Sequence, residues 1–135
     1  MESAPPVVAV INSSRDVVDM LRIAMEDAGL VAVTALTDQI RDGEVDLERL
    51  VQHHDPSVVL YDIAPPYDAN WRLFQHLSGR PVMAGRPFIV TTTNMYYVRD
   101  LAGPHHPVFE VIGKPYDLEQ IVQATKAAIA GRAPR

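Results

Sequence analysis

Five short runs of β-branched and other apolar residues recur along the chain, and amphipathic stretches separate them. The runs span residues 7–11, 31–35, 57–62, 87–92 and 108–112. A short apolar run is typical of a strand that is buried on both faces, as in a parallel sheet. Strands that alternate with helices predict such a sheet with helices on both sides. We therefore expect an α/β fold.

Apolar residues recur at helical spacing between these runs. The expected helices cover residues 17–28, 46–54, 69–78, 94–102 and 117–130. Ser13 and Asp16 have the spacing of a capping box at the start of the first helix, and Gly29 is well placed to end it. Residues 36–45 remain as a long connection.

Length and composition narrow the class of protein. With 135 residues, the chain suits one domain over residues 1–135, with a core of about residues 6–131. No apolar run approaches the roughly 20 residues of a membrane-spanning helix. The N-terminus has no basic residue ahead of an apolar stretch, as a secretion signal would. The chain has no cysteine, which excludes disulfides, thiolate zinc sites and thiol nucleophiles and fits a cytoplasmic location.

The net charge of −5 argues against binding to nucleic acid, because phosphate backbones require a basic surface. The histidine pairs 53–54 and 105–106 raise the question of a metal site. No carboxylate accompanies either pair at ligand spacing, so we expect exposed histidines.

Three polar residues follow the ends of predicted strands. Asp62 ends the third run, Thr92 ends the fourth, and Lys114 follows the fifth. In open parallel sheets, ligands bind beyond the carboxyl ends of the strands. A carboxylate, a hydroxyl and an ammonium at that edge suit capture of a phosphoryl group, with the carboxylate as the nucleophile.

The order of the elements and three motifs resemble the receiver domains of two-component response regulators. The motifs are residues 59–63 with Pro66 after them, residues 89–92, and residues 113–117. The resemblance covers nearly the whole chain. It implies a flavodoxin-like (βα)5 three-layer sandwich with the strands of its parallel sheet in the order 2-1-3-4-5.

The resemblance also implies roles for individual residues. Asp62 would be the phospho-acceptor, and Thr92 the switch hydroxyl that follows the phosphoryl group. Lys114 would pair with that group, and Pro115 would follow a cis peptide bond. The chain would then be a stand-alone bacterial signalling module without enzymatic output. A histidine kinase or phosphotransfer protein would be its donor, and an unidentified downstream protein would carry the output.

Some positions depart from the pattern of that family. Receivers usually carry two acidic residues after the first strand, which hold Mg²⁺ with the phospho-acceptor and a backbone carbonyl. Here the acidic positions read Asn12 and Ser13, the carbonyl position is Ala64, and only Asp62 remains as a carboxylate. Mg²⁺ binding is therefore expected to be weak. Asp16 lies nearby, and we expect it in the first helical turn.

The aromatic residue that the family often has before the lysine is also missing. Val111 stands there, and regular strand alternation puts Phe109 on the same face, two residues too early. The fourth helix is expected to be short. Its start, residues 95–97, combines Met and two Tyr and is equally compatible with a partner surface and with the core. Trp71 is expected to pack in the core.

Two other functions remain open. Because of Asn12 and Ser13, the chain is also compatible with a pseudo-receiver that binds a partner independently of phosphorylation. A flavin carrier would share the fold, and Ser13 with Ser14 resembles a hydroxyl-rich phosphate loop. That loop lacks the glycine that lets a backbone approach a phosphate. The sequence does not decide whether the chain forms a homodimer.

Overall fold

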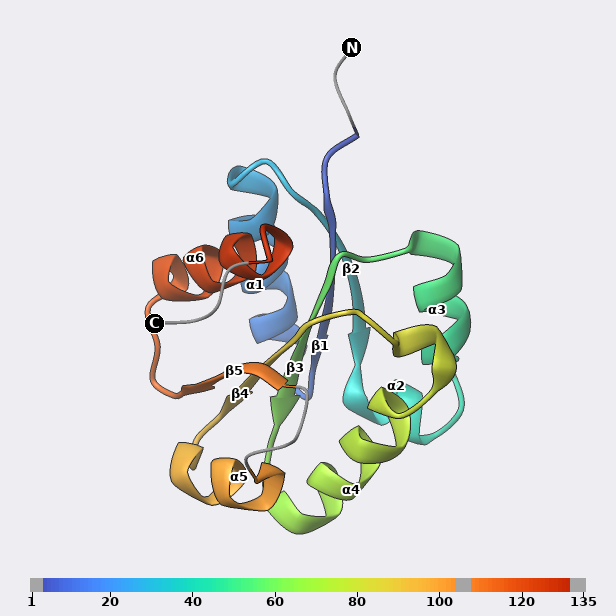
Figure 1. Ribbon diagram of the computed structural model, residues 1–135, viewed down its shortest axis with the longest axis vertical. Helices are drawn as coiled ribbons and strands as arrows, with labels where there is room; N and C mark the ends of the chain where they lie inside the picture. The colour runs from blue at the N-terminus through green and yellow to red at the C-terminus, as the bar shows by residue number, and fades with distance from the viewer. Residues whose placement is uncertain (1–3, 104–107, 132–135) are drawn as a thin grey trace.

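The computed structural model describes residues 4–103 and 108–131 as five strands that alternate with helices (Figure 1). The strands are β1 (Val7–Asn12), β2 (Val31–Leu36), β3 (Val58–Ile63), β4 (Phe88–Thr92) and β5 (Val108–Gly113). The α-helices are α1 (Arg15–Asp27), α2 (Thr37–Arg41), α3 (Leu47–His54), α4 (Tyr67–Ser78), α5 (Met95–Ala102) and α6 (Leu118–Ile129). A short 3₁₀ helix, η1 (Pro81–Met83), precedes β4.

All five strands form one parallel sheet in the order β2-β1-β3-β4-β5. This order and the flavodoxin-like architecture confirm the expectation from the sequence. β1 and β3 lie in the middle and are almost entirely buried, which explains why their sequences are apolar without alternation. The carboxyl ends of the strands meet at one edge, the lower part of the sheet in Figure 1.

Two hydrophobic cores lie on opposite faces of the sheet. One core packs the sheet against α1 and α6 and contains Leu21, Leu60 and Ile121. The other packs it against α3, α4 and α5 and contains Val51, Phe74 and Val98. Figure 1 shows α1 and α6 on one side of the strands, with α2, α3 and α4 on the other. The molecule therefore has the three layers that the sequence predicts.

Side-chain caps begin several of the helices. Asp46, Asn94 and Asp117 each accept a hydrogen bond from a backbone N–H in the first turn of the helix that follows. The first helix differs from the expectation, because Ser14 is its N-cap and accepts from Val17 N. A capping box that starts at Ser13 is therefore wrong by one residue.

The first helix ends as expected. Its last residue is Asp27, with Ala28 as the C-cap. Gly29 follows at φ 85°, a left-handed conformation that costs a glycine little.

Two features of the helices differ from the expectation. The connection 36–45 contains α2, whose single turn is too short for a periodic signal. α4 begins at Tyr67, two residues before the expected start, directly after Pro66. No helix in residues 4–103 and 108–131 is both long and apolar enough to cross a bilayer.

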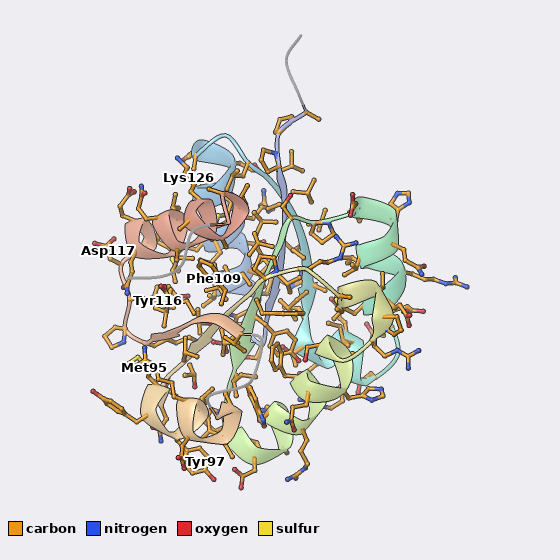
Figure 2. All side chains as sticks on the ribbon, in the orientation of Figure 1. Met95, Tyr97, Phe109, Tyr116, Asp117 and Lys126 are labelled. Carbon is orange, nitrogen blue, oxygen red and sulfur yellow. The ribbon has the colours of Figure 1, made fainter. Side chains whose placement is uncertain are left out.

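A bulge in β5 changes the faces of its side chains. Phe88 pairs with Val108, but the next residue, Ile89, pairs with Glu110, so the register skips Phe109. Phe109 then packs in the core of α1 and α6, whereas Val111 packs in the opposite core. Figure 2 shows Phe109 on the α6 side. The expectation that both residues share a face is wrong, because the bulge interrupts the alternation.

Candidate functional site

Asp62 lies near the carboxyl end of β3, and its side chain is only 1% exposed. Lys114, which directly follows β5, places its Nζ 2.7 Å from Asp62 Oδ1. The Lys114 side chain is 25% exposed, so the buried carboxylate pairs with a cation that lies between it and the solvent. The structure therefore brings together two of the three residues that the sequence singles out at the strand ends.

The hydroxyl beside the acid belongs to Thr91. Its Oγ1 donates to Asp62 Oδ1 over 2.7 Å, and the two residues are direct partners in the β3–β4 register. Thr92 does not contact Asp62 in this structure; its Oγ1 donates to Ile63 O over 2.9 Å and accepts from Asn94 N. Thr91 is not among the residues singled out at the strand ends, although the β3–β4 register pairs it with Asp62.

The two oxygens of the Asp62 carboxylate have different surroundings. Oδ1 accepts from Lys114 and from Thr91, whereas Oδ2 is buried without a hydrogen-bond partner among the described residues. Asp62 lines a cavity of about 100 Å³. Thr37, at the start of α2, lines it too, and its buried Oγ1 also has no partner in the described part of the chain. Buried polar atoms are rarely left unpaired, so this cavity is a candidate binding site.

A chain of polar contacts forms another wall of the cavity. Arg41 Nη1 donates to Asp38 Oδ1 over 2.7 Å, and Arg41 Nη2 donates to Asn70 Oδ1 over 2.6 Å. Asn70 Nδ2 in turn donates to Ala64 O over 2.7 Å. Asp38 from α2, Asn70 from α4 and Ala64 from the β3–α4 loop thus fix the guanidinium at the cavity. Arg41 is not among the residues singled out in the sequence, because residues 36–45 were expected to be a connection without a helix.

The residues at the metal positions of receivers do not fit Mg²⁺ well. Asn12 is neutral, and its Oδ1 accepts from Ser14 N over 3.0 Å. Ala64 O accepts from Asn70. Ser13 lines the cavity but adds no charge. Within the described residues, no three His, Asp or Glu side chains are close enough to share a metal ion.

The segment after β5 is positioned by its backbone. Lys114 N donates to Thr92 O over 2.7 Å, and the Lys114–Pro115 peptide bond is cis, as expected. A second cis bond, Pro65–Pro66, lies between β3 and α4. Gly113 allows α5 to approach, because a Cβ at this position would lie 3.3 Å from the Cβ of Met95.

Tyr116 borders the site on the side of Lys114. Together with Lys114 and Pro115 it lines a shallow depression that Val17 and Thr93 complete. Burial raises the pKa of the Tyr116 hydroxyl, and the negative charge of Asp62 raises it further.

Two tyrosines connect α4 to the start of α5. The hydroxyl of Tyr67 lies 2.5 Å from Thr93 Oγ1, and Tyr97 donates to Asp68 Oδ1. Tyr97 is 41% exposed and Tyr96 is 77% exposed, so this end of α5 belongs to the surface. Figure 2 shows Tyr97 at the edge of the molecule.

Other residues singled out in the sequence have structural or solvent-exposed positions. Trp71 is buried in the core beside Phe74, as expected. His53 and His54 are exposed at the end of α3. His105 and His106 lie outside the described residues.

Comparisons with known proteins identify the fold. No family model matches the sequence, and no curated protein matches it. Among solved structures, the chemotaxis response regulator CheY4 of Vibrio cholerae is 15% identical, with a TM-score of 0.71 over 92% of this chain and 98% of that one. The receiver domain of nitrogen regulatory protein C is 22% identical, with a TM-score of 0.72 over 96% and 98%.

A sensor protein from Polaromonas sp. JS666 is 16% identical, with a TM-score of 0.72 over 93% of this chain and 97% of that one. These similarities span nearly the whole length of each neighbour, and the strand order of this chain is that of the expected sandwich. The chain therefore has the fold of response regulator receiver domains.

Proposed function

We propose that this chain is a single, atypical receiver domain that accepts a phosphoryl group on Asp62 and signals through protein–protein interaction. The arrangement of the Asp62 carboxylate is the observation that carries the proposal. Two donors hold Oδ1, so the carboxylate has a fixed orientation. Oδ2 has no hydrogen-bond donor among the described residues, and Asp62 lines a cavity. An oriented carboxylate with one free oxygen suits nucleophilic attack on phosphorus.

The positive charges at the site support the same chemistry. Phosphoryl transfer depends mostly on positioning and on neutralising the charge of the equatorial oxygens. Lys114 lies against Asp62, and Arg41 faces the same cavity. In this proposal Lys114 moves from Asp62 Oδ1 to a phosphoryl oxygen once the carboxylate is esterified.

The signal would leave the site through the β4–α5 connection. Thr92 is held by Ile63 O, and Asn94 N donates to Thr92 Oγ1. Rotation of Thr92 toward a phosphoryl group would break both contacts and release the start of α5, where Tyr96 and Tyr97 are exposed. We propose a histidine kinase or phosphotransfer protein as the donor, a downstream protein as the reader, and the cytoplasm as the location. The domain itself would have no enzymatic output.

The test is a titration with beryllofluoride, which mimics an aspartyl phosphate, followed by amide NMR shifts and Trp71 fluorescence. It is run once with Mg²⁺ and once with a chelator, so that the outcome does not depend on the metal. Saturable shifts around Asp62 and Thr91 that vanish in Asp62→Ala support the proposal. Absence of shifts under both conditions contradicts it.

A second candidate function is a pseudo-receiver that binds its partner without phosphorylation. The observation in its favour is that Asn12 Oδ1 and Ala64 O, at two metal positions of receivers, already accept hydrogen bonds from the protein. An unchanged affinity for the partner in Asp62→Asn and after beryllofluoride treatment would favour this function over the first.

A further inference from the structure

Asp62 lines the cavity, and one of its carboxylate oxygens, Oδ2, is buried without a hydrogen-bond partner among the described residues. Lys114 and Thr91 both contact Oδ1, and neither donates to Oδ2. Thr37 lines the same cavity, and its buried Oγ1 is also unpaired in the described residues. A phosphoryl group on Oδ2 would bring further negative charge into this space. A cation must therefore face the cavity if the site is to accept one.

Arg41 is positioned to be that cation. Its guanidinium has five N–H donors, and among the described residues Asp38 and Asn70 accept hydrogen bonds from it. The remaining N–H groups have no acceptor in the described part of the chain, and the planar fork of a guanidinium fits two oxygens of a phosphoryl group. Asn70 is buried and fixed by Ala64 O, so it orients Arg41 without neutralising its charge.

The pairing of Arg41 with Asp38 is easily released. Both side chains are exposed, at 46% and 73%, and exposed ion pairs contribute little free energy. The charge of Arg41 also acts on Tyr61, the residue before Asp62 in β3. Burial raises the pKa of the neighbouring Tyr61 hydroxyl, and Arg41 acts in the opposite direction by lowering it.

We propose that Arg41 takes the place of the divalent metal in this site, so that Asp62 accepts a phosphoryl group without Mg²⁺. The inference rests on the proposed function. In the reaction with acetyl phosphate, Asp62 Oδ2 forms a bond to phosphorus. The bond between phosphorus and the acetyl oxygen breaks, and acetate leaves with the electron pair. Arg41 contacts the equatorial oxygens during the transfer.

The experiment measures the initial rate of phosphorylation by acetyl phosphate, with intact-protein mass spectrometry and hydroxylamine sensitivity to identify the acyl phosphate. The rate is measured in EDTA and in millimolar Mg²⁺. The wild-type rate is expected to differ between the two conditions by less than about threefold. Arg41→Met is expected to lower the rate in EDTA by about tenfold or more, the scale of losing one donor to a developing oxyanion.

Two further variants distinguish the effect of the charge at position 41 from a general effect of the substitution on the fold. Arg41→Lys keeps the charge but loses the fork, and its rate in EDTA is expected to lie between those of wild type and Arg41→Met. Arg49→Met is the matched control, because Arg49 also pairs with an aspartate three residues earlier but lies on α3, away from the cavity. Its rate is expected to equal that of wild type. Thermal unfolding checks that all variants are folded.

A gain-of-function variant tests directly whether Arg41 takes the place of the metal. Ser13→Asp in the Arg41→Met background restores a carboxylate at a metal position, so phosphorylation is expected to return in Mg²⁺ and not in EDTA. Phosphorylation of wild type only in Mg²⁺, with no effect of Arg41→Met, overturns the inference and leaves the proposed function intact. Absence of phosphorylation in wild type under both conditions overturns both.

Discussion

Lys114 Nζ lies 2.7 Å from Asp62 Oδ1 and joins the end of β5 to the end of β3. The contact crosses β4, which lies between these two strands in the sheet. Through it, the ammonium compensates a carboxylate that is otherwise shielded from water. The pair is therefore both a stabilising contact and the resting state of the proposed phosphoryl site.

The first prediction concerns the strength of this pair. Lys114→Met leaves the Asp62 carboxylate with Thr91 as its remaining donor, and we expect it to destabilise the fold more than Asp62→Asn does. In a double-mutant cycle with these two substitutions, the coupling is expected to be about 1–3 kcal/mol. Urea unfolding of the four proteins measures it. A coupling near zero would mean that the pair does not stabilise the fold.

The second prediction concerns Thr91. Thr91→Val removes the hydroxyl donor to Asp62 Oδ1 with little change of shape, and we expect a loss of about 1–2 kcal/mol in the free energy of unfolding. The control is Thr125→Val, because Thr125 is equally buried but donates to a carbonyl of its own helix. Its loss is expected to be smaller. Equal losses of unfolding free energy in the two variants would show that the hydrogen bond from Thr91 to the carboxylate is no stronger than one to a backbone carbonyl.

The third prediction concerns Tyr61, whose hydroxyl is buried without a partner among the described residues. Tyr61→Phe removes this unpaired group, so we expect the free energy of unfolding at pH 7 to rise by about 1 kcal/mol. A rise is not expected for Tyr116→Phe, since Tyr116 is only half-buried. Denaturant unfolding of both variants measures the difference.

The pH dependence of Tyr61→Phe follows from the raised pKa of Tyr61. Below the ordinary tyrosine pKa of about 10, the hydroxyl is protonated in both the folded and the unfolded chain. Above it, the unfolded chain loses the proton while the folded chain keeps it, so the wild type loses stability as pH rises. The advantage of Tyr61→Phe is therefore expected to grow above that pH. If the difference in unfolding free energy between Tyr61→Phe and wild type stayed constant from pH 7 to alkaline pH, the pKa of Tyr61 would not be raised in the folded chain.

The fourth prediction concerns the contact between α4 and α5. The hydrogen bond to Asp68 raises the pKa of Tyr97, and nearby negative charge adds to the effect. Asp68→Asn removes that charge, so the pKa of Tyr97 is expected to fall toward its ordinary value. An NMR titration of the Tyr97 ring, with Glu119→Gln on α6 as the control, measures the change. An unchanged titration in Asp68→Asn would mean that the two side chains do not interact in solution.

Much of the fold was predictable because the strands carry a strong local signal. β1 and β3 are buried on both faces, so their sequences are continuously apolar. The strand order came from the family resemblance and not from this pattern. α2 was not predictable in this way, because one helical turn contains no periodicity. The bulge at Phe109 was also missed, since it depends on pairing with β4.

The candidate site was predicted only in part for a related reason. Asp62 and Lys114 end up together because the carboxyl ends of parallel strands share one edge of the sheet. Thr91 was overlooked because Thr92 occupies the family position, yet the β3–β4 register puts Thr91 beside the acid. Arg41 reaches the cavity through α2 and Asn70, a contact between residues 29 positions apart that no local pattern indicates.

The most direct test of the central claim is whether Asp62 itself accepts a phosphoryl group. Purified protein is incubated with acetyl phosphate, with and without EDTA, and the modified residue is located by tandem mass spectrometry after borohydride trapping. The account predicts one hydroxylamine-sensitive phosphoryl group per chain, on Asp62, in both conditions, and none in Asp62→Asn. An unmodified wild-type protein in both conditions, or modification that persists in Asp62→Asn, would contradict it.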